Sequence, residues 1–338
     1  MKNFEYAQPR NVAQLLPLLS PTAGEVELLG GGTDLVGLMR SNVVAPDRVV
    51  NITDVAEMRV VQRLPDENVT VIGAALRLDE IHEHSELASH PALHQAICGT
   101  RSMQFQSQST LGGELCRRPR CWYFRDGHGL LADGGRLVAE GDNRYHAIFD
   151  NQGPAKFVSA SRLAPALIAL GAEAVVVGPA EDYVQTIALE DLYRTPADET
   201  ERETILQPGQ VLAQIRLPDD SATPGLPGNN ASYEVRHGEG PDDPLAAAAA
   251  ALTLEGGVVQ EAKIVLGQVA PTPRVSTEAS QLLVGRKIDE TLAQQAGRAA
   301  VAAASPLSNN EYKVQLAEVA VTRAVLKAAG LPTGGFDE

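Results

Sequence analysis

Two glycine-rich turns are the parts of this sequence whose residue types are best suited to hold a ligand. The first, Gly30–Gly32, follows an apolar run that ends at Leu29 and precedes Thr33 and Asp34. Glycine lacks Cβ and adopts positive φ, so the backbone can approach a ligand closely. Backbone N–H groups here, followed by the positive end of a helix, suit a phosphate or diphosphate. Thr33 adds a hydroxyl donor, whereas the Asp34 carboxylate would repel phosphate and is predicted to be a helix N-cap. Taken alone, the segment is equally compatible with a plain tight turn.

A second turn of this kind, Thr110–Glu114, lies about 80 residues further along the chain. Neither turn fits G-x-G-x-x-G or G-x-x-x-x-G-K-[ST], which argues against a Rossmann or P-loop site. The pair resembles the FAD-binding (medium) subunit of the molybdenum hydroxylases, the family of xanthine dehydrogenase, carbon monoxide dehydrogenase, aldehyde oxidoreductase and 4-hydroxybenzoyl-CoA reductase. That family carries an A-G-G-T-D-L turn and a T-[IL]-G-G-N-L turn around one FAD. The resemblance covers nearly the whole chain.

The resemblance implies a set of cofactor-binding residues. They comprise the backbone of both turns, two residues of a later segment and one residue of an apolar strand that lies along the flavin. These residues are Leu29, Gly30, Gly31, Gly32, Thr33, Asp34, Thr110, Gly112, Gly113, Glu114, His146, Ile148 and Leu212. The sequence contains no G-x-S-x-G or H-E-x-x-H motif, so a cofactor is expected to carry the chemistry, and the catalytic residues stay unknown.

Three positions depart from the family pattern. Glu114 replaces an asparagine, so it either turns away from the phosphates or weakens their binding. Arg162 replaces the aspartate of a family S-D-L sequence. A lysine that is common after a Ser-Tyr pair is absent after Ser232 and Tyr233, where Arg236 is a possible substitute.

Residues 116–148 resemble an insertion that holds an additional [4Fe–4S] cluster in one branch of the family. Cys121 matches its opening R-C-x-Y-F-R sequence, but the following segment Asp126–Gly135 has no cysteine. We therefore predict the insertion without its cluster and no bound metal. His146, in the segment that closes the insertion, is predicted either to face the flavin or to be a hydrogen-bonded structural residue.

Other groups in this region leave alternatives open. The loop Cys116–Arg125 combines four arginines and three aromatic residues. It could stack on a flavin, offset its phosphates, dock a partner or be an ordinary loop. Cys116 and Cys121 are expected to be free thiols. The histidines between His82 and His94 are expected to lie on the surface, because no ligand set of metal-binding spacing accompanies them.

Hydrophobic periodicity and turn residues predict an α+β fold. A helix interrupted by Pro17 precedes the first turn, and a strand, a hairpin and two helices precede the second. A helix and two strands then complete the first domain, and a hairpin, a further strand and three helices form the second. The predicted ranges are 12–19, 48–52, 59–64, 69–73, 76–84, 91–97, 161–171, 174–177, 211–218, 245–254, 258–259, 262–269, 277–283, 289–304 and 310–329. The alanine-rich range 245–254 is predicted as a strand by resemblance alone, since alanine favours helix.

The predicted architecture has two domains. The resemblance implies a two-part FAD-binding domain of the PCMH type over residues 1–222 and a small domain of sheet plus helices over residues 230–338. The Pro- and Gly-rich segment Asp219–Asn230 is the predicted boundary between them. A chain of 338 residues is long enough to bury two cores.

Composition limits the function classes. The net charge of −15 disfavours nucleic acid and anionic membranes as partners. No apolar run is long enough to span a bilayer, and Met1–Tyr6 has no signal-peptide core, so a cytoplasmic protein is expected. By resemblance, the chain passes electrons from [2Fe–2S] clusters of a small subunit, fed by a molybdopterin-binding large subunit, through FAD to an external acceptor. A stand-alone FAD oxidoreductase and a scaffold that has lost FAD are the alternatives.

Overall fold

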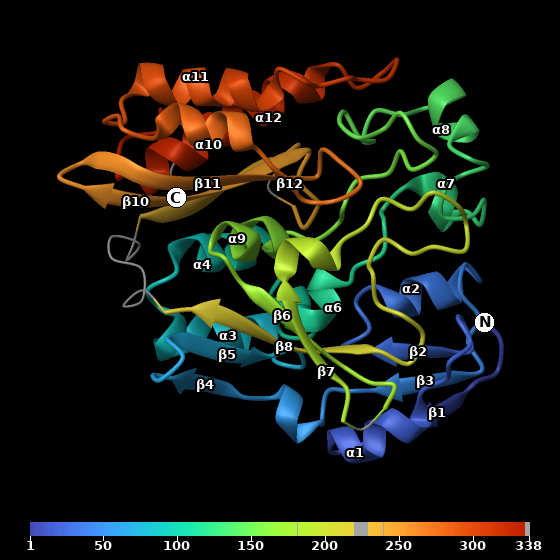
Figure 1. The fold of residues 1–338 in the computed structure, drawn as a ribbon. Coiled ribbons are helices and arrows are strands. Elements are labelled where there is room, and N and C mark those ends of the chain that lie inside the picture. Colours follow the sequence, from blue (N-terminus) through green and yellow to red (C-terminus); the bar gives the residue numbers. More distant parts are fainter. Residues whose placement is uncertain (181, 220–228, 239, 335–338) are drawn as a thin grey trace.

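A computed structural model describes residues 1–180, 182–219, 229–238 and 240–334, which form three β-sheets with helices between and above them (Figure 1). The central part of the predicted domain boundary, residues 220–228, lies outside the described residues. The combination of helices and sheets confirms the predicted α+β class.

The N-terminal sheet is parallel, in the order β1-β3-β2, and it carries the first glycine turn at the end of β2. Its strands are β1 (Glu5–Ala7), β2 (Val26–Leu29) and β3 (Arg48–Asn51). Helix α2 (Leu35–Arg40) follows the turn directly. The turn therefore lies where a parallel strand meets a helix, a common location for ligand sites in sheets of this kind.

The helix predicted at residues 12–19 is interrupted at Pro17, as expected. It is an α-helix only over α1 (Val12–Leu15) and continues as the 3₁₀ helix η1 (Leu16–Leu18). The side chain of Asn11 caps α1 by accepting a hydrogen bond of 2.8 Å from the backbone N–H of Gln14.

A five-stranded antiparallel sheet has the order β4-β5-β8-β6-β7. Its strands are β4 (Val61–Leu64), β5 (Val69–Gly73), β6 (Glu173–Val177), β7 (Val184–Ala188) and β8 (Val211–Pro218). The hairpin β4–β5 and the strands β6 and β8 confirm the sequence prediction, whereas β7 was not predicted. Its exposed, weakly alternating residues explain the omission.

Short helices connect the strands between β3 and β8 in the chain. They are η2 (Ala56–Met58), α3 (Leu78–Glu83), η3 (Ser85–Leu87), α4 (Pro91–Gly99), α5 (Met103–Gln106), α6 (Leu111–Leu115), α7 (Trp122–Arg125), α8 (Arg136–Glu140), α9 (Leu163–Ala169) and η4 (Leu189–Leu192). Helices α7 and α8 belong to the predicted insertion, whose Phe124 and Val138 form a small apolar cluster with Leu38 of α2 and Phe157. Within the described residues, no helix has the length and apolar character needed to cross a membrane.

The C-terminal part is an antiparallel sheet, in the order β12-β11-β10-β9, covered by three helices (Figure 1). The elements are β9 (Asn230–Val235), β10 (Ala246–Glu255), β11 (Val258–Gly267), β12 (Arg274–Val275), α10 (Thr277–Leu283), α11 (Glu290–Val301) and α12 (Tyr312–Ala328). Helix α12 packs on β9 and β10, while α4 and α9 pack against the same sheet from the N-terminal part. The alanines Ala246–Ala251 form a strand, as predicted, because their small side chains are buried between these layers. Tertiary burial here outweighs the helix propensity of alanine.

Candidate cofactor site

The two glycine turns meet in the folded chain. The backbone N–H of Thr110 donates to the Gly30 carbonyl oxygen at 3.2 Å, and the hydroxyls of Thr33 and Ser109 lie 3.0 Å apart. Gly31 has φ +109°, and a Cβ at this position would collide with the carbonyl oxygen of Gln108. Only glycine fits this approach without displacing the neighbouring backbone.

The two turns differ in the hydrogen bonds that their amides make. Across the described ranges, no acceptor is found for the backbone N–H groups of Gly31–Asp34. In the second turn, the N–H groups of Leu111 and Gly112 already donate to backbone carbonyls at 2.9 and 2.8 Å, and that of Gly113 donates to Thr110 Oγ1 at 3.2 Å. The sequence treated both turns as donors of bare amides, but the structure leaves only the first one free for an anion.

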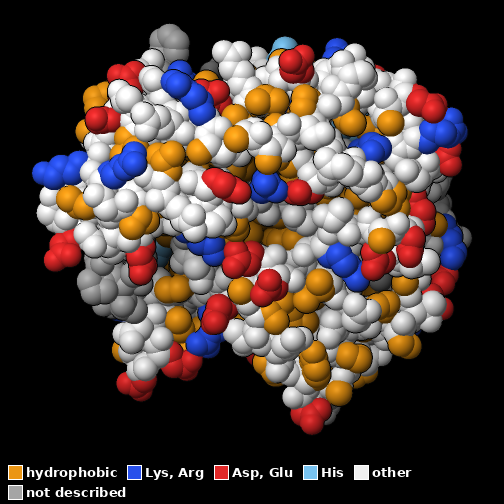
Figure 2. Space-filling view, turned by 45° about the horizontal axis from the view of Figure 1, so that its top comes forward, with side chains coloured by type: hydrophobic (Ala, Val, Ile, Leu, Met, Phe, Trp, Pro, Cys, Tyr) orange, Lys and Arg blue, Asp and Glu red, His pale blue; other side chains and the backbone are white. Residues whose placement is uncertain are grey.

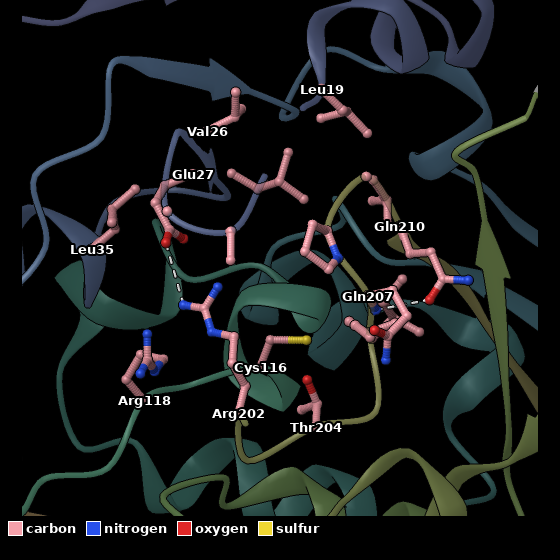
Figure 3. A pocket seen from close by; sticks show the side chains of 18 of the residues that line it. Leu19, Val26, Glu27, Leu35, Cys116, Arg118, Arg202, Thr204, Gln207 and Gln210 are labelled. Atoms are coloured by element: carbon pink, nitrogen blue, oxygen red, sulfur yellow. Dashed lines mark hydrogen bonds and ion pairs between the residues drawn. The ribbon is translucent and has the colours of Figure 1, made fainter. Parts of the chain in front are cut away.

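A pocket opens beside the two turns (Figure 3). Five of the residues expected to bind the cofactor line it: Gly30, Asp34, Gly112, Gly113 and Leu212. Further lining residues come from the segment 194–212, which leads into β8. The remaining expected residues of the turns are not among those that line the pocket: Leu29, Gly31, Gly32, Thr33, Thr110 and Glu114.

Asp34 does not cap α2 with its side chain, contrary to the prediction. Its carboxylate accepts a hydrogen bond of 2.9 Å from the backbone N–H of Arg118 and pairs with Arg125 at 2.7 Å and with Arg120 at 3.2 Å. The reason is the arginine loop 117–125, whose three charged or polar donors outcompete the single amide that a cap would satisfy.

Glu114 turns away from the pocket. It is buried, and its Oε1 accepts a hydrogen bond of 2.8 Å from the backbone N–H of Arg162, while Arg117 lies 3.6 Å away. Burial raises the pKa of the Glu114 carboxyl, and Arg117 opposes that shift. Two departures from the family pattern, Glu114 and Arg162, thus contact each other.

The Arg162 guanidinium lies at the boundary between the N- and C-terminal parts. It donates to the carbonyl oxygens of Gly99 and Asp242 and lies 3.4 Å from Glu234 Oε2. Arg236, the possible substitute for the missing lysine, joins this group by donating to Gly99 and pairing with Glu234 at 2.9 Å. It is not among the residues that line the pocket.

His146 and Ile148 are not brought to this pocket either. His146 is buried with Nε2 3.1 Å from Cys121 Sγ, which matches the structural alternative stated for it. Burial lowers its pKa to about 4. The backbone N–H of Ile148 donates to Val269, and its side chain belongs to the apolar core beneath α10–α12. The end of the insertion packs against the C-terminal part, and this packing keeps His146 and Ile148 away from the pocket.

The cysteines and the remaining histidines of the chain form no metal site among the described residues. Cys98, Cys116 and Cys121 are free. Among the described residues, no group of three or more His, Cys, Asp or Glu side chains is arranged to hold a metal ion. His90 is buried at 2% exposure, so the expectation of a surface residue is wrong there, because its helix α4 packs against β9.

Sequence reasoning missed the charged residues of the pocket wall. Arg118 pairs with Glu203, and Arg202 Nη2 lies 3.3 Å from Glu27 Oε1 (Figure 3). Cys116 also lines this wall, and burial together with Glu203 raises the pKa of its thiol to about 12, so it is uncharged. The only signal for Arg118 was the arginine-rich loop; nothing in the segment around Arg202 distinguished it from a surface loop.

The site fits a dinucleotide with a diphosphate. The amides without acceptors at Gly31–Asp34 follow directly on the lining residue Gly30, and Asp34 itself lines the pocket. The approach of the two turns depends on glycines whose Cβ would collide with neighbours, and apolar residues such as Leu28 and Leu212 line the pocket. Free amides suit phosphate oxygens, and apolar walls suit aromatic rings.

Comparison with known proteins agrees with this geometry. The family described as the FAD binding domain in molybdopterin dehydrogenase matches residues 2–220, and that of the CO dehydrogenase flavoprotein C-terminal domain matches residues 231–328. The aldehyde oxidoreductase FAD-binding subunit PaoB of Escherichia coli is 26% identical over 97% of this chain and 99% of its own length. The carbon monoxide dehydrogenase medium chain of Afipia carboxidovorans is 26% identical over 96% of both chains.

Solved structures share the fold. Quinoline 2-oxidoreductase from Pseudomonas putida has a TM-score of 0.74 at 21% identity, with 97% of each chain covered. A Cu,Mo-CO dehydrogenase has a TM-score of 0.74 at 24% identity, with 98% of each chain covered. The matched relatives are subunits or medium chains of larger enzymes, which implies partner chains here too. FAD is the cofactor of the family that these comparisons establish. The chain belongs to the FAD-binding subunits of the molybdenum hydroxylases.

Proposed function

We propose that this chain is the subunit through which electrons leave a molybdenum hydroxylase, passing from [2Fe–2S] clusters of a small subunit to an external acceptor. A molybdopterin-binding large subunit supplies the electrons. FAD supplies the redox chemistry when bound. The single observation that carries the proposal is the convergence of both glycine turns on one pocket.

Within this proposal, residues 1–222 are the FAD-binding domain and residues 230–338 the C-terminal domain. The backbone amides of Gly31–Asp34 hold the diphosphate, and Leu212 contributes to the apolar wall. The remaining residues of the two turns hold these groups in position. The three free cysteines support a cytoplasmic location, because thiols persist in reducing compartments.

Purification of the native complex tests the proposal. We expect a flavin absorption spectrum, FAD as the flavin released on denaturation, and co-purification with chains that carry iron–sulfur clusters and molybdopterin. A colourless chain that does not bind added FAD would contradict the assignment. A yellow chain without any partner would instead identify the stand-alone oxidoreductase.

A further inference from the structure

Two arginine–carboxylate pairs form part of the pocket wall next to the glycine turns. Arg118 comes from the arginine loop and pairs with Glu203, while Arg202 pairs with Glu27 of β2, three residues before Gly30. All four charged residues line the pocket. Figure 3 shows Glu27, Arg118 and Arg202 on the same side of the pocket.

The Arg118–Glu203 pair has little access to bulk water, whereas the Arg202–Glu27 pair is partly exposed on the arginine side. The side chains of Arg118 and Glu203 are 16% and 9% exposed, and those of Arg202 and Glu27 are 38% and 16% exposed. A guanidinium binds phosphate oxygens through two parallel hydrogen bonds, and burial strengthens such contacts.

The glycine turn supplies amides but no cationic side chain. Residues Gly30–Leu35 contain no lysine or arginine, so the charge that balances a bound diphosphate must come from other segments. Among the described residues that line the pocket, three arginines and three carboxylates balance in charge: Arg118, Arg194, Arg202, Glu27, Asp34 and Glu203. A diphosphate would therefore gain from the arginines only by taking the place of their carboxylates.

We propose that Arg118 and Arg202 are the cations that bind the diphosphate of FAD, and that Glu27 and Glu203 hold these guanidiniums at the pocket until the cofactor displaces them. This inference rests on the proposed function. Arg194 also lines the pocket, but it pairs at 3.2 Å with Glu201 of its own segment. The proposed pairs instead join separate segments around the turn.

Titration of FAD-free protein with FAD, followed by flavin fluorescence at low and high ionic strength, tests this inference. Arg118→Gln and Arg202→Gln are each expected to raise the Kd for FAD at least about tenfold and to weaken its salt dependence. Glu27→Gln and Glu203→Gln are expected to lower the Kd about threefold, because each removes a competing negative charge. Arg216→Gln, on β8 beside Glu67 and Glu173, is the matched control and should leave the Kd unchanged.

Each result separates this inference from the proposed function. Wild-type protein that binds no FAD contradicts the proposed function itself. If the wild type binds FAD and the Kd of Arg202→Gln lies within about twofold of the wild-type Kd, the inference is overturned and the proposed function stands. A Glu27→Gln variant that binds FAD more weakly than the wild type also overturns the inference. Arg202 is the more exposed of the two arginines, so this arm stands even where Arg118→Gln does not fold.

A second titration distinguishes the source of the diphosphate. NAD⁺ carries the same group, so it is titrated against FAD-loaded wild type and variants. The inference requires the arginine variants to have a higher Kd for FAD than the wild type. An altered Kd for NAD⁺ together with an unchanged Kd for FAD would assign the arginines to an external dinucleotide and overturn the assignment.

Discussion

At the scale of single residues, Gly31 decides whether the two turns can meet. Its φ of +109° and the position of the Gln108 carbonyl leave no room for a side chain. The resemblance identified this glycine, but the physical reason lies in the second segment that packs on it. The backbone contact at Gly31 therefore serves the fold as much as the ligand.

Gly31→Ala is expected to separate the turns, lower the free energy of unfolding by about 2 kcal/mol and abolish FAD retention. The matched control is Gly37→Ala in α2, where a Cβ would meet no atom within 4 Å and helix propensity improves. Urea unfolding and the ratio of flavin to protein absorbance measure both effects. Equal flavin content in the two variants would contradict the role of Gly31.

His146 makes a second prediction at this scale. Burial lowers its pKa from 6.5 to about 4, so the folded state holds the neutral imidazole. Below about pH 6.5 the unfolded chain binds a proton that the folded chain does not, and the free energy of unfolding falls as the pH decreases toward 4. At pH 5 this loss is at most about 2 kcal/mol.

Urea unfolding at pH 7 and pH 5 measures the loss in wild type and in His146→Gln. The variant lacks the imidazole, so its stability should change less over this range. An identical change in both proteins would show that other groups account for it.

At the scale of elements, the arginine loop 117–125 is held on the first turn by Asp34. Three donors from this loop converge on one carboxylate, and the Arg118 guanidinium reaches the pocket from the same loop. The sequence left four roles open for the loop. Its attachment to Asp34 gives the loop a defined anchor beside the first glycine turn.

Asp34→Ala is expected to free this loop, because it leaves charged groups without their partner. Tryptic cleavage after Arg117, Arg120 and Arg125 should become at least about tenfold faster, as the free energy of local opening falls. Asp47→Ala, which removes the exposed pair with Lys2, is the control and should change cleavage little. Unchanged cleavage in Asp34→Ala would contradict the anchoring role.

At the scale of the whole molecule, Asp243 connects the C-terminal part with the segments around the cofactor site. Its carboxylate lies 3.0 Å from both Arg117 and Arg120 and 3.7 Å from Arg162. These arginines together lower the pKa of the Asp243 carboxyl against the opposing effect of burial.

Elsewhere on the surface, Figure 2 shows acidic and basic side chains interspersed on the face it displays.

Asp243→Asn is expected to lower the free energy of unfolding by about 3 kcal/mol, because Arg117 and Arg162 lose a charged partner in a buried setting. Asp242→Asn, at the exposed neighbouring position, should change it by less than about 0.5 kcal/mol. Urea unfolding at neutral pH measures both. Equal effects would mean that Asp243 does not connect the two parts through its charge.

The order of most elements, the helix break at Pro17, the α+β class and both glycine turns could be predicted from the sequence. Each of these depends on neighbours along the chain: a proline without an N–H, a hydrophobic period, a glycine that permits positive φ. Pattern and turn chemistry are local, so they can be read without the fold.

Which charged groups meet depends on how the chain packs and could not be predicted from the sequence. Glu27 and Arg202 are 175 residues apart, and Asp34 caps no helix because arginines more than 80 residues away reach it first. The alanine strand β10 likewise owes its conformation to helices packed on both faces of its sheet. An ion pair carries no signal in either partner's local sequence, since its energy arises only when packing brings the two segments together and excludes water.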